Sequence, residues 1–333
     1  MLNVKKTVAV ILLTVMVALL SFGCEKADEK LVKITVSEVA HSVFYAPQYA
    51  ALSLGFFEEE GLEVTVINSN GADKVMSAVL SGDVQIGLSG PEACIYVYSA
   101  DKSDYAKVFA QLTKRDGSFL VAREPDSDFA WSKLAGKYII GGRAGGVPEM
   151  TVEYVLRKNG VEPHVDCTVD TSIQFAAMAG AFIGGTGDYV ALFEPTATAV
   201  EQEGKGYIVA SIGQESGEIP YTAYYAMESY MKENPEVILS FTDAVYKGMQ
   251  WIDTHTPREV AEVIAPHFPD TDINVLEKVA ERYKEIDAWN KTPSMTKDAF
   301  DRLQDVIEQA GQLPARVEFS DVVTNEYAEK AVK

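Results

Sequence analysis

The sequence predicts an α/β fold in two lobes followed by a helical C-terminal segment, and three observations support this prediction. Short β-rich runs alternate with helical stretches from Leu31 to Met227, a pattern typical of largely parallel sheets with helices on both faces. The stretch after Met227 has helical periodicity almost throughout. The chain has 333 residues, of which 47% are hydrophobic, and that length favours two domains over a single core.

The N-terminus has the pattern of an export signal, which we place at residues 1–23. Two lysines precede an apolar, uncharged run over 7–22, slightly shorter than the roughly 18 residues that usually span a bilayer. The run ends at Gly-Cys, which resembles a bacterial lipobox, and a charged linker occupies residues 24–30. We therefore expect a lipid on Cys24 and a location at the extracytoplasmic face of the cell membrane. Ser21 stands where a lipobox usually carries an aliphatic residue, and an uncleaved signal anchor is the alternative.

The charge and the cysteines exclude several classes of function. A net charge of −20 disfavours nucleic acid as a partner, because nucleic acid requires clustered Lys and Arg. Cys94 and Cys167 lie in apolar contexts, so we expect two buried free thiols and neither a disulfide framework nor a metal site. The four histidines are widely separated, and no metal or nucleophile constellation is apparent. We expect no cofactor and no catalytic residues.

The first part of the chain contains nine candidate strands, and the last part contains four candidate helices. The strands are expected at 33–37, 62–68, 84–88, 106–112, 119–122, 138–141, 165–169, 189–193 and 207–210. The C-terminal helices are expected at 235–254, 258–265, 273–289 and 297–311.

Two short segments are the best candidates for crossings between the lobes. They are residues 114–118 and 219–223. These crossings predict a second lobe at 116–222, inserted into a first lobe made of 31–115 and 223–333.

Four segments run into a proline that opens a helix. The prolines are Pro47, Pro91, Pro148 and Pro195, and proline is favoured in the first turn of a helix. Ligands of open α/β sheets bind beyond the carboxyl ends of strands, where helix amino ends offer free N–H groups. Because two of the starts fall in each expected lobe, the pattern predicts a ligand cleft between the lobes.

The N-terminal half resembles a known family. Residues 44–51 (FYAPQYAA) lead into residues 55–64 (GFFEEEGLEV), and residues 83–87 (DVQIG) and 90–92 (GPE) follow. This spacing is similar to that of the SsuA/THI5-like (NMT1-like) solute-binding proteins, over about residues 31–225. The resemblance implies a periplasmic-binding-protein fold of type II, whose two lobes close on a ligand. It also implies partnership, as a monomer, with the permease and ATPase of an ABC importer.

The candidate ligand-binding residues are those of the expected cleft, the Gly-rich loop over 141–149 and the crossings. Arg143 in that loop has the geometry to grip an anionic group, whereas a flexible turn with a solvated arginine is the alternative. Ser89 and Glu92 also match a capping box at a helix start. The full set is His41, Ser42, Phe44, Tyr45, Ser89, Glu92, Arg115, Arg143, Gly145, Gly146, Asp188, Tyr189, Phe193, Glu194 and Tyr221.

The aromatic members of this set favour a flat ligand, since rings stack on rings and polar groups fix the orientation. We expect an aromatic heterocycle such as a thiamine-pyrimidine precursor or a riboflavin-like compound. A sulfonate- or nitrate-type anion is the alternative ligand. An enzyme related to the THI5-type pyrimidine synthases shares the fold, but the cysteine-rich CCCFC motif of those enzymes is absent from this sequence. A ligand-binding sensor subunit is a further alternative.

Overall fold

The computed structural model describes residues 30–100 and 103–333. The expected signal at 1–23, the lipidated Cys24 and all of the linker except Lys30 lie outside the described residues. Within the described ranges, no helix is both long enough and apolar enough to span a membrane.

The first sheet has five strands in the order β2-β1-β3-β10-β4. Its strands are β1 Val32–Glu38, β2 Leu62–Asn68, β3 Ile86–Ser89, β4 Ala106–Thr113 and β10 Thr222–Met227. Strand β1 pairs in parallel with β2 and β3, whereas β10 lies antiparallel between β3 and β4. A late segment of the chain thus completes a sheet built mostly from its first part.

The second sheet also has five strands, in the order β7-β6-β8-β5-β9. Its strands are β5 Ser118–Ala122, β6 Tyr138–Ile140, β7 Thr168–Asp170, β8 Tyr189–Phe193 and β9 Tyr207–Ser211. Strand β6 pairs in parallel with β7 and β8, and β5 lies antiparallel between β8 and β9.

Both sheets are therefore mixed, which corrects the expectation of largely parallel sheets. The antiparallel strand of each sheet is the first one the chain enters after crossing from the other: β5 follows β4 directly, and β10 follows the return crossing. The sequence analysis placed the start of β10 in a crossing segment and did not identify it as a strand. Its hydrogen-bonding partners, β3 and β4, lie more than 100 residues earlier, so no local pattern identifies it.

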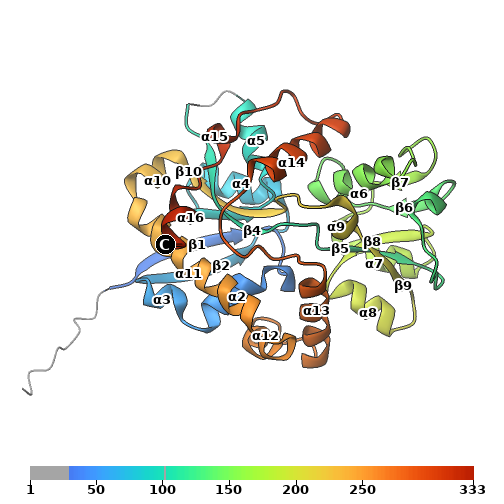
Figure 1. Cartoon of the computed structure of the whole chain (residues 1–333), viewed down its shortest axis with the longest axis horizontal. Coiled ribbons are helices and arrows are strands. Elements are labelled where there is room, and N and C mark those ends of the chain that lie inside the picture. Colours follow the sequence, from blue (N-terminus) through green and yellow to red (C-terminus); the bar gives the residue numbers. More distant parts are fainter. Residues whose placement is uncertain (1–29, 101–102) are drawn as a thin grey trace, which may run out of the picture. The chain divides into compact units, whose positions relative to one another are not determined.

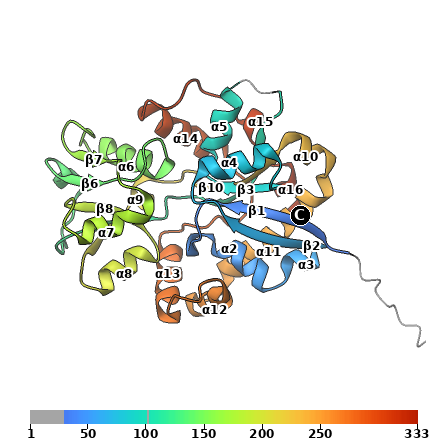
Figure 2. The same cartoon turned by 180° about the vertical axis from the view of Figure 1, so that it is seen from behind.

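The helices cover both faces of each sheet. In Figures 1 and 2, α4 and α5 lie on one side of the first sheet and α2, α3 and α11 on the other. The α-helices are α2 Ala46–Ser53, α3 Phe56–Glu59, α4 Ala72–Ser81, α5 Glu92–Ser99, α6 Val147–Lys158, α7 Met178–Ile183, α8 Thr196–Gln202, α9 Ile212–Ser216, α10 Glu228–Glu233, α11 Pro235–Thr254, α12 Pro257–Ile264, α13 Ile273–Glu285, α14 Lys297–Gln309, α15 Phe319–Val322 and α16 Glu326–Ala331. Short 3-10 helices are η1 Val43–Tyr45, η2 Trp131–Leu134, η3 Phe175–Ala177 and η4 Ala265–His267.

Side chains on β5 and β8 alternate between two hydrophobic cores, as successive residues of a strand must. Phe119 and Val121 join a large core that continues through the first sheet, whereas Leu120 and Ala122 face a smaller one. The smaller core is closed by α6, α9 and η2. Apolar packing is therefore continuous between the two sheets on one side of the second sheet only.

Several predicted boundaries are confirmed, and others shift. The predicted elements at 62–68, 189–193 and 235–254 coincide with β2, β8 and α11. The predicted helix at 273–289 ends early, at Glu285, because Asp287 adopts a left-handed backbone conformation with φ 54°. Strand β7 begins at Thr168, three residues later than predicted.

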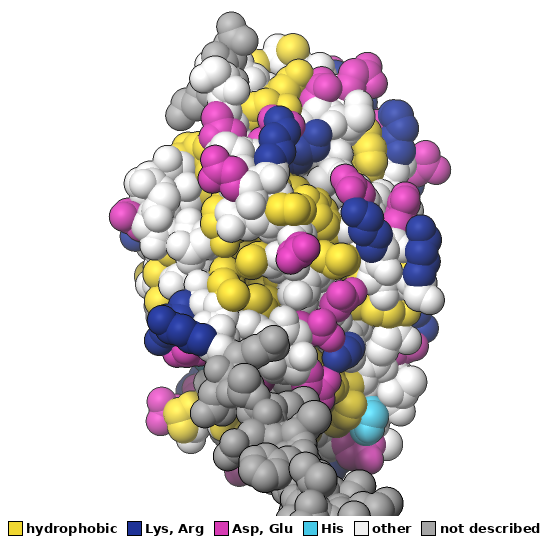
Figure 3. Space-filling view, turned by 90° about the vertical axis from the view of Figure 1, so that its left-hand side faces the viewer, with side chains coloured by type: hydrophobic (Ala, Val, Ile, Leu, Met, Phe, Trp, Pro, Cys, Tyr) yellow, Lys and Arg dark blue, Asp and Glu magenta, His cyan; other side chains and the backbone are white. Residues whose placement is uncertain are grey.

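One face of the molecule mixes acidic, basic and hydrophobic side chains, as Figure 3 shows. Many of the described lysines are paired; Lys247, for example, lies 2.8 Å from both Glu59 and Glu60. Exposed pairs of this kind contribute little to stability, roughly 0–1 kcal/mol each.

Helix α11 approaches α2 closely at Gly248. A Cβ atom on Gly248 would lie 2.3 Å from the Pro47 carbonyl oxygen and 3.1 Å from the Ala51 Cβ. The contact therefore requires glycine in the middle of a long helix, even though glycine weakens helices by about 0.5–1 kcal/mol relative to alanine.

We predict that Gly248→Ala lowers the free energy of unfolding by about 1–3 kcal/mol, because the new methyl group forces the two helices apart. Chemical denaturation measures the change. Gly180→Ala is the matched control, since Gly180 is also helical but has open space around it. The control is expected to be neutral or slightly stabilising; equal behaviour of the two variants would contradict the packing argument.

Candidate functional site

The four proline-associated helix starts lie at the junction of the two sheets. Pro47 and Pro148 occupy the first turns of α2 and α6, and Pro91 and Pro195 immediately precede α5 and α8. The connection after β1 and the end of β8 meet through the rings of Phe44 and Phe193, whose centroids are 5.8 Å apart. This junction is the candidate site.

Aromatic rings fill the centre of the junction. Phe44 is 1% exposed and packs against Phe193, Tyr221 and Tyr283, with centroid distances of 5.8, 5.9 and 5.2 Å. Trp289 Nε1 donates a 2.9 Å hydrogen bond to the Phe44 carbonyl oxygen and fixes the turn. A Cβ at Gly117 would lie 2.5 Å from the Phe44 ring, so the first crossing must be glycine there.

Four polar atoms at this junction are buried but have no hydrogen-bond partner among the residues that the structure describes. They are Glu92 Oε2, Tyr96 Oη, Asp116 Oδ2 and Tyr221 Oη. We call these four residues the junction cluster. The side chains of Glu92, Asp116 and Tyr221 are 5, 0 and 4% exposed.

The members of the junction cluster are close enough to perturb one another's ionisation. Burial raises the Tyr221 pKa well above its ordinary value, and the charges of Asp116 and Glu92 raise it further. Burial and the charge of Glu92 raise the pKa of Tyr96 in the same way. The Tyr221 hydroxyl influences Asp116, but the two groups do not meet the geometry of a hydrogen bond.

The two carboxyl groups are hard to ionise. Burial raises the pKa of Glu92 to about 7, although the amino end of α5 and the charge of Arg143 oppose the rise. Burial raises the pKa of Asp116 to about 6, against hydrogen bonds from Ser118. The Ser118 amide and hydroxyl both donate to Asp116 Oδ1, at 2.6 and 2.5 Å. A charged ligand at the junction would shift the pKa values of both Glu92 and Asp116.

Ser42 and Glu194 connect the two sheets. Ser42 Oγ donates to the Glu194 carbonyl oxygen at 3.3 Å and accepts from the Phe44 amide at 3.2 Å. The Glu194 carboxylate is fully engaged: Arg282 of α13 donates to it at 2.9 Å, and the Thr198 amide donates at 2.8 Å. Glu194 therefore holds α8 against α13.

The Gly-rich loop before α6 also reaches across the junction. Arg143, with its side chain 49% exposed, donates to Asp73 of α4 at 3.1 Å. The Gly145 amide donates to Glu149 Oε2 at 3.1 Å, and a Cβ at Gly145 would lie 3.9 Å from Gln312. Gly146 caps α6 with extended backbone, and its amide donates to the Arg143 carbonyl oxygen.

Three candidates after β1 and β3 have partners of their own. His41 lies 2.9 Å from Glu38 and 2.8 Å from the His267 carbonyl oxygen, and it lines a separate cavity of about 330 Å³. Tyr45 is buried, which raises its pKa. Ser89 pairs with Tyr225 at 2.8 Å and does not cap α5, whose N-cap residue is Pro91.

Arg115 lies in the first crossing, where it contributes to a charged group outside the junction cluster. Its guanidinium is 3.8 Å from Glu218 of the return crossing and 3.6 Å from Asp287. Lys114 pairs with the same two acids. These ion pairs join the two crossings to the end of α13.

Asp188 and Tyr189 do not join the other candidates. They stand at the amino end of β8, whereas Phe193 and Glu194 stand at its carboxyl end, at the junction. Asp188 accepts a hydrogen bond from the Tyr138 amide at 2.9 Å. Tyr189 faces the smaller core, beside Phe129. The sequence analysis grouped all four because they are adjacent in the chain, but a strand separates its two ends by its full length.

Comparisons with known proteins identify the family and the fold. Residues 43–259, more than half of the chain, match the family described as NMT1/THI5 like. The chain belongs to this family. It is also 45% identical over 305 residues to "Putative binding protein YtlA" of Bacillus subtilis (strain 168), covering 92% of this chain and 91% of that protein.

Solved structures share the fold at low sequence identity. The alkanesulfonate-binding protein SsuA from Xanthomonas axonopodis pv. citri bound to MOPS superposes with a TM-score of 0.70 at 14% identity, covering 88% of this chain and 98% of that chain. The periplasmic nitrate-binding protein NrtA from Synechocystis PCC 6803 gives 0.71 at 15% identity, covering 91% and 89%. The predicted periplasmic-binding-protein fold is confirmed.

In this NMT1/THI5-like chain, sequence analysis missed three residues of the site. Asp116 was recognised only as part of a crossing. Tyr96 stands four residues after Glu92 on α5, and this spacing puts both on one helix face, a signal that was available. Tyr283 approaches Phe44 from α13, far along the chain, and has no local signal.

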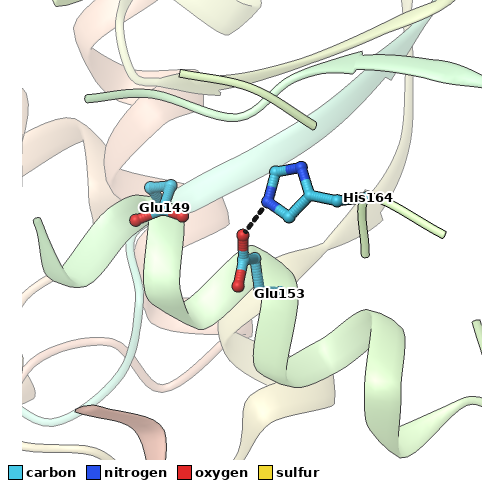
Figure 4. A group of neighbouring side chains, drawn as sticks. All are labelled: Glu149, Glu153 and His164. Atoms are coloured by element: carbon cyan, nitrogen blue, oxygen red, sulfur yellow. Dashed lines mark hydrogen bonds and ion pairs between the residues drawn. The ribbon is translucent and has the colours of Figure 1, made fainter. Parts of the chain in front are cut away.

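A second acidic group lies on α6, shown in Figure 4. Glu149, Glu153 and His164 place three potential metal-ligand atoms within 4.8 Å of one another. Glu153 already pairs with His164 at 2.7 Å and Arg157 at 2.9 Å. The sequence analysis expected no such group, because His164 joins α6 from a later loop. The existing pairs neutralise Glu153, so we assign the group a structural role.

Glu149 and Glu153 perturb each other's ionisation. Burial and the neighbouring Glu153 together raise the pKa of Glu149 to about 8. Burial also opposes ionisation of Glu153, but hydrogen bonds from Glu149, His164 and Arg157 outweigh it and lower the pKa. The Gly145 amide donates to Glu149 and opposes this rise, because it stabilises the ionised carboxylate.

We predict that Glu149→Gln flattens the fall in stability between pH 5 and pH 8. A carboxyl group with a raised folded-state pKa binds a proton that the unfolded chain releases in this range, so wild-type stability falls as the pH rises. Glutamine remains neutral and removes that contribution. Urea denaturation at several pH values measures the slope. Glu162→Gln, which changes an exposed acid beside Arg157, is the control; an unchanged slope in Glu149→Gln would contradict the raised pKa of Glu149.

Proposed function

We propose that this chain is the solute-binding component of an ABC-type importer, and that it captures a small molecule at the junction of its two sheets. Membership of the NMT1/THI5-like family and the likeness to a binding protein of Bacillus subtilis support the proposal. The observation that carries it is the junction itself, where aromatic rings and the junction cluster converge from both sheets. The permease and the ATPase of the importer are the expected partners.

Capture requires two lobes that open and close. We propose lobes at 31–115 with 223–333 and at 116–222, joined by the two crossings. The contacts between the sheets suit reversible closure: the Arg143–Asp73 pair is exposed, and such pairs contribute roughly 0–1 kcal/mol. The Ser42 hydrogen bond to the Glu194 carbonyl oxygen is long, at 3.3 Å. These two contacts are weak, but opening would also have to separate Phe44 from Phe193 and Arg282 from the buried Glu194, and a ligand would have to compensate for both.

The proposed ligand is a flat aromatic heterocycle, in the class of pyrimidine precursors or flavins. Phe44, Phe193 and Tyr221 supply rings from both sheets, and a planar ligand gains from stacking on such rings. The alternative is an oxyanion, because the structural neighbours are named for alkanesulfonate and nitrate. Arg143 is the residue that would favour an oxyanion.

We place the protein outside the cell, held at the extracytoplasmic face of the membrane by a lipid on Cys24. The apolar run that ends at Gly23-Cys24 supports this location. The proposed role is reversible binding by a monomer without turnover, since solute-binding proteins release what they bind unchanged.

We predict that the protein purified under mild conditions carries one small molecule, released on unfolding and identified by mass spectrometry. Added back at about 100 times its Kd, this compound stabilises the folded protein by about 2.7 kcal/mol through mass action. The melting temperature measures the shift. Recovery of no compound from freshly isolated protein, together with no shift from the extract of its host cells, would contradict the proposed function.

A further inference from the structure

The unpaired polar atoms of the junction cluster are energetically unfavourable in the unliganded protein, and a bound ligand would pair them. More than 90% of buried polar groups in folded proteins are hydrogen-bonded, and each group left unpaired costs about 1–3 kcal/mol. Four such atoms gather at one place, and two of them belong to carboxyl groups. Proteins retain unfavourable groups of this kind where a ligand satisfies them.

Acidic side chains already lie at three of the helix starts around the junction. Glu92 folds back over the amino end of α5, so that a Cβ on Gly90 would lie 1.9 Å from Glu92 Oε2. Glu149 lies in the first turn of α6 and receives the Gly145 amide. Glu194 receives the Thr198 amide at the start of α8. Three of the four helix amino ends therefore already have an acidic side chain of their own, and the start of α2 has none.

The nearby arginines also have acidic partners. Arg143, whose charge reaches Glu92, pairs with Asp73. Arg282 pairs with Glu194 and Glu201. An oxyanion at the junction would lie beside Glu92 and Asp116, and an ionised carboxylate repels an anion strongly at short range in a buried site.

We propose that the ligand is a nitrogenous compound that donates N–H hydrogen bonds to Glu92 and Asp116, and that the site excludes sulfonate- and nitrate-type oxyanions. An amino-substituted or positively charged flat ring satisfies both carboxyl groups while it stacks on Phe44 and Phe193. The Tyr221 hydroxyl has one proton and two lone pairs, so it completes the site as donor or acceptor. This inference rests on the proposed solute-binding function and names its ligand class.

Calorimetric titration with a matched pair of probes tests the charge preference. Benzamidine presents a flat cation with N–H donors, and benzenesulfonate presents the same ring with an oxyanion. We expect benzamidine to bind at least tenfold more tightly at pH 7.5. We also expect its affinity to fall toward pH 5.5, as Glu92 and Asp116, with pKa values raised by burial to about 7 and about 6, take up protons. The charge of benzamidine is constant over this range.

Glu92→Gln and Tyr221→Phe identify the groups responsible. Each variant is expected to weaken benzamidine binding at least fivefold while the unliganded protein keeps or raises its melting temperature, because Tyr221→Phe removes a buried unpaired hydroxyl and Glu92→Gln removes a buried ionisable group. A purely structural role for Glu92 would instead lower the melting temperature and leave the affinity unchanged. Glu63→Gln, which removes an exposed acid of β2, is the control and should change neither quantity.

Tighter binding of benzenesulfonate or nitrate than of benzamidine would overturn the proposed ligand class and leave the solute-binding function intact. Absence of benzamidine binding would also overturn it. Failure of the function itself is recognised separately, by the absence of any compound released from the isolated protein.

Discussion

The paired crossings between the two sheets are the constraint on which the rest of the structure depends. The Ile219 amide donates to the Lys114 carbonyl oxygen at 3.0 Å, and the Tyr221 amide donates to the Thr113 carbonyl oxygen at 3.2 Å. The hydroxyls of Thr113 and Thr222 lie 2.6 Å apart. Because the two segments are bound to each other, each sheet receives its antiparallel strand, β5 or β10, directly from a crossing.

The pairing of the two crossings also places polar side chains at the junction. Asp116 lies in the outward crossing and Tyr221 in the return crossing, so the hydrogen bonds that align these segments also align two members of the junction cluster. Glu92 and Tyr96 approach from α5, the helix that follows β3, and β3 lies beside β10 in the first sheet. The candidate site therefore lies beside the crossings, and a ligand there would contact groups from both sheets.

The fold alone leaves the ligand open, since proteins named for alkanesulfonate and nitrate share it at about the same TM-score. What separates ligand classes is the local supply of charge at the helix starts. In this chain the side chains of Glu92, Glu149 and Glu194 occupy three of them, which favours a ligand that donates hydrogen bonds.

Sequence reasoning recovered the elements whose signal is local. Strand β8 and the twenty-residue helix α11 were predicted to the residue, because alternation and helical period are visible within each segment. Strand β10 was missed, because it is defined by partners more than 100 residues away. Family resemblance supplied the fold.

The residues of the candidate site could likewise be predicted where the signal is local, and their long-range contacts could not. Phe44, Glu92, Phe193 and Tyr221 were identified from their positions beside helix starts and crossings. The sequence could not show that Glu194 accepts a hydrogen bond from Arg282, because Arg282 lies 88 residues later in the chain. The sequence also could not show that Glu92 and Asp116 each have a carboxyl oxygen without a hydrogen-bond partner within the described chain, because partners are known only once the chain is folded.

A crystal structure of the protein isolated with its native solute tests the central claim most directly. The account predicts density for a flat nitrogenous compound at the junction, with nitrogen atoms about 2.7–3.2 Å from the carboxyl oxygens of Glu92 and Asp116 and its ring against Phe44 and Phe193. Density for an oxyanion beside Arg143, or for the solute in the separate cavity beside His41, would contradict it.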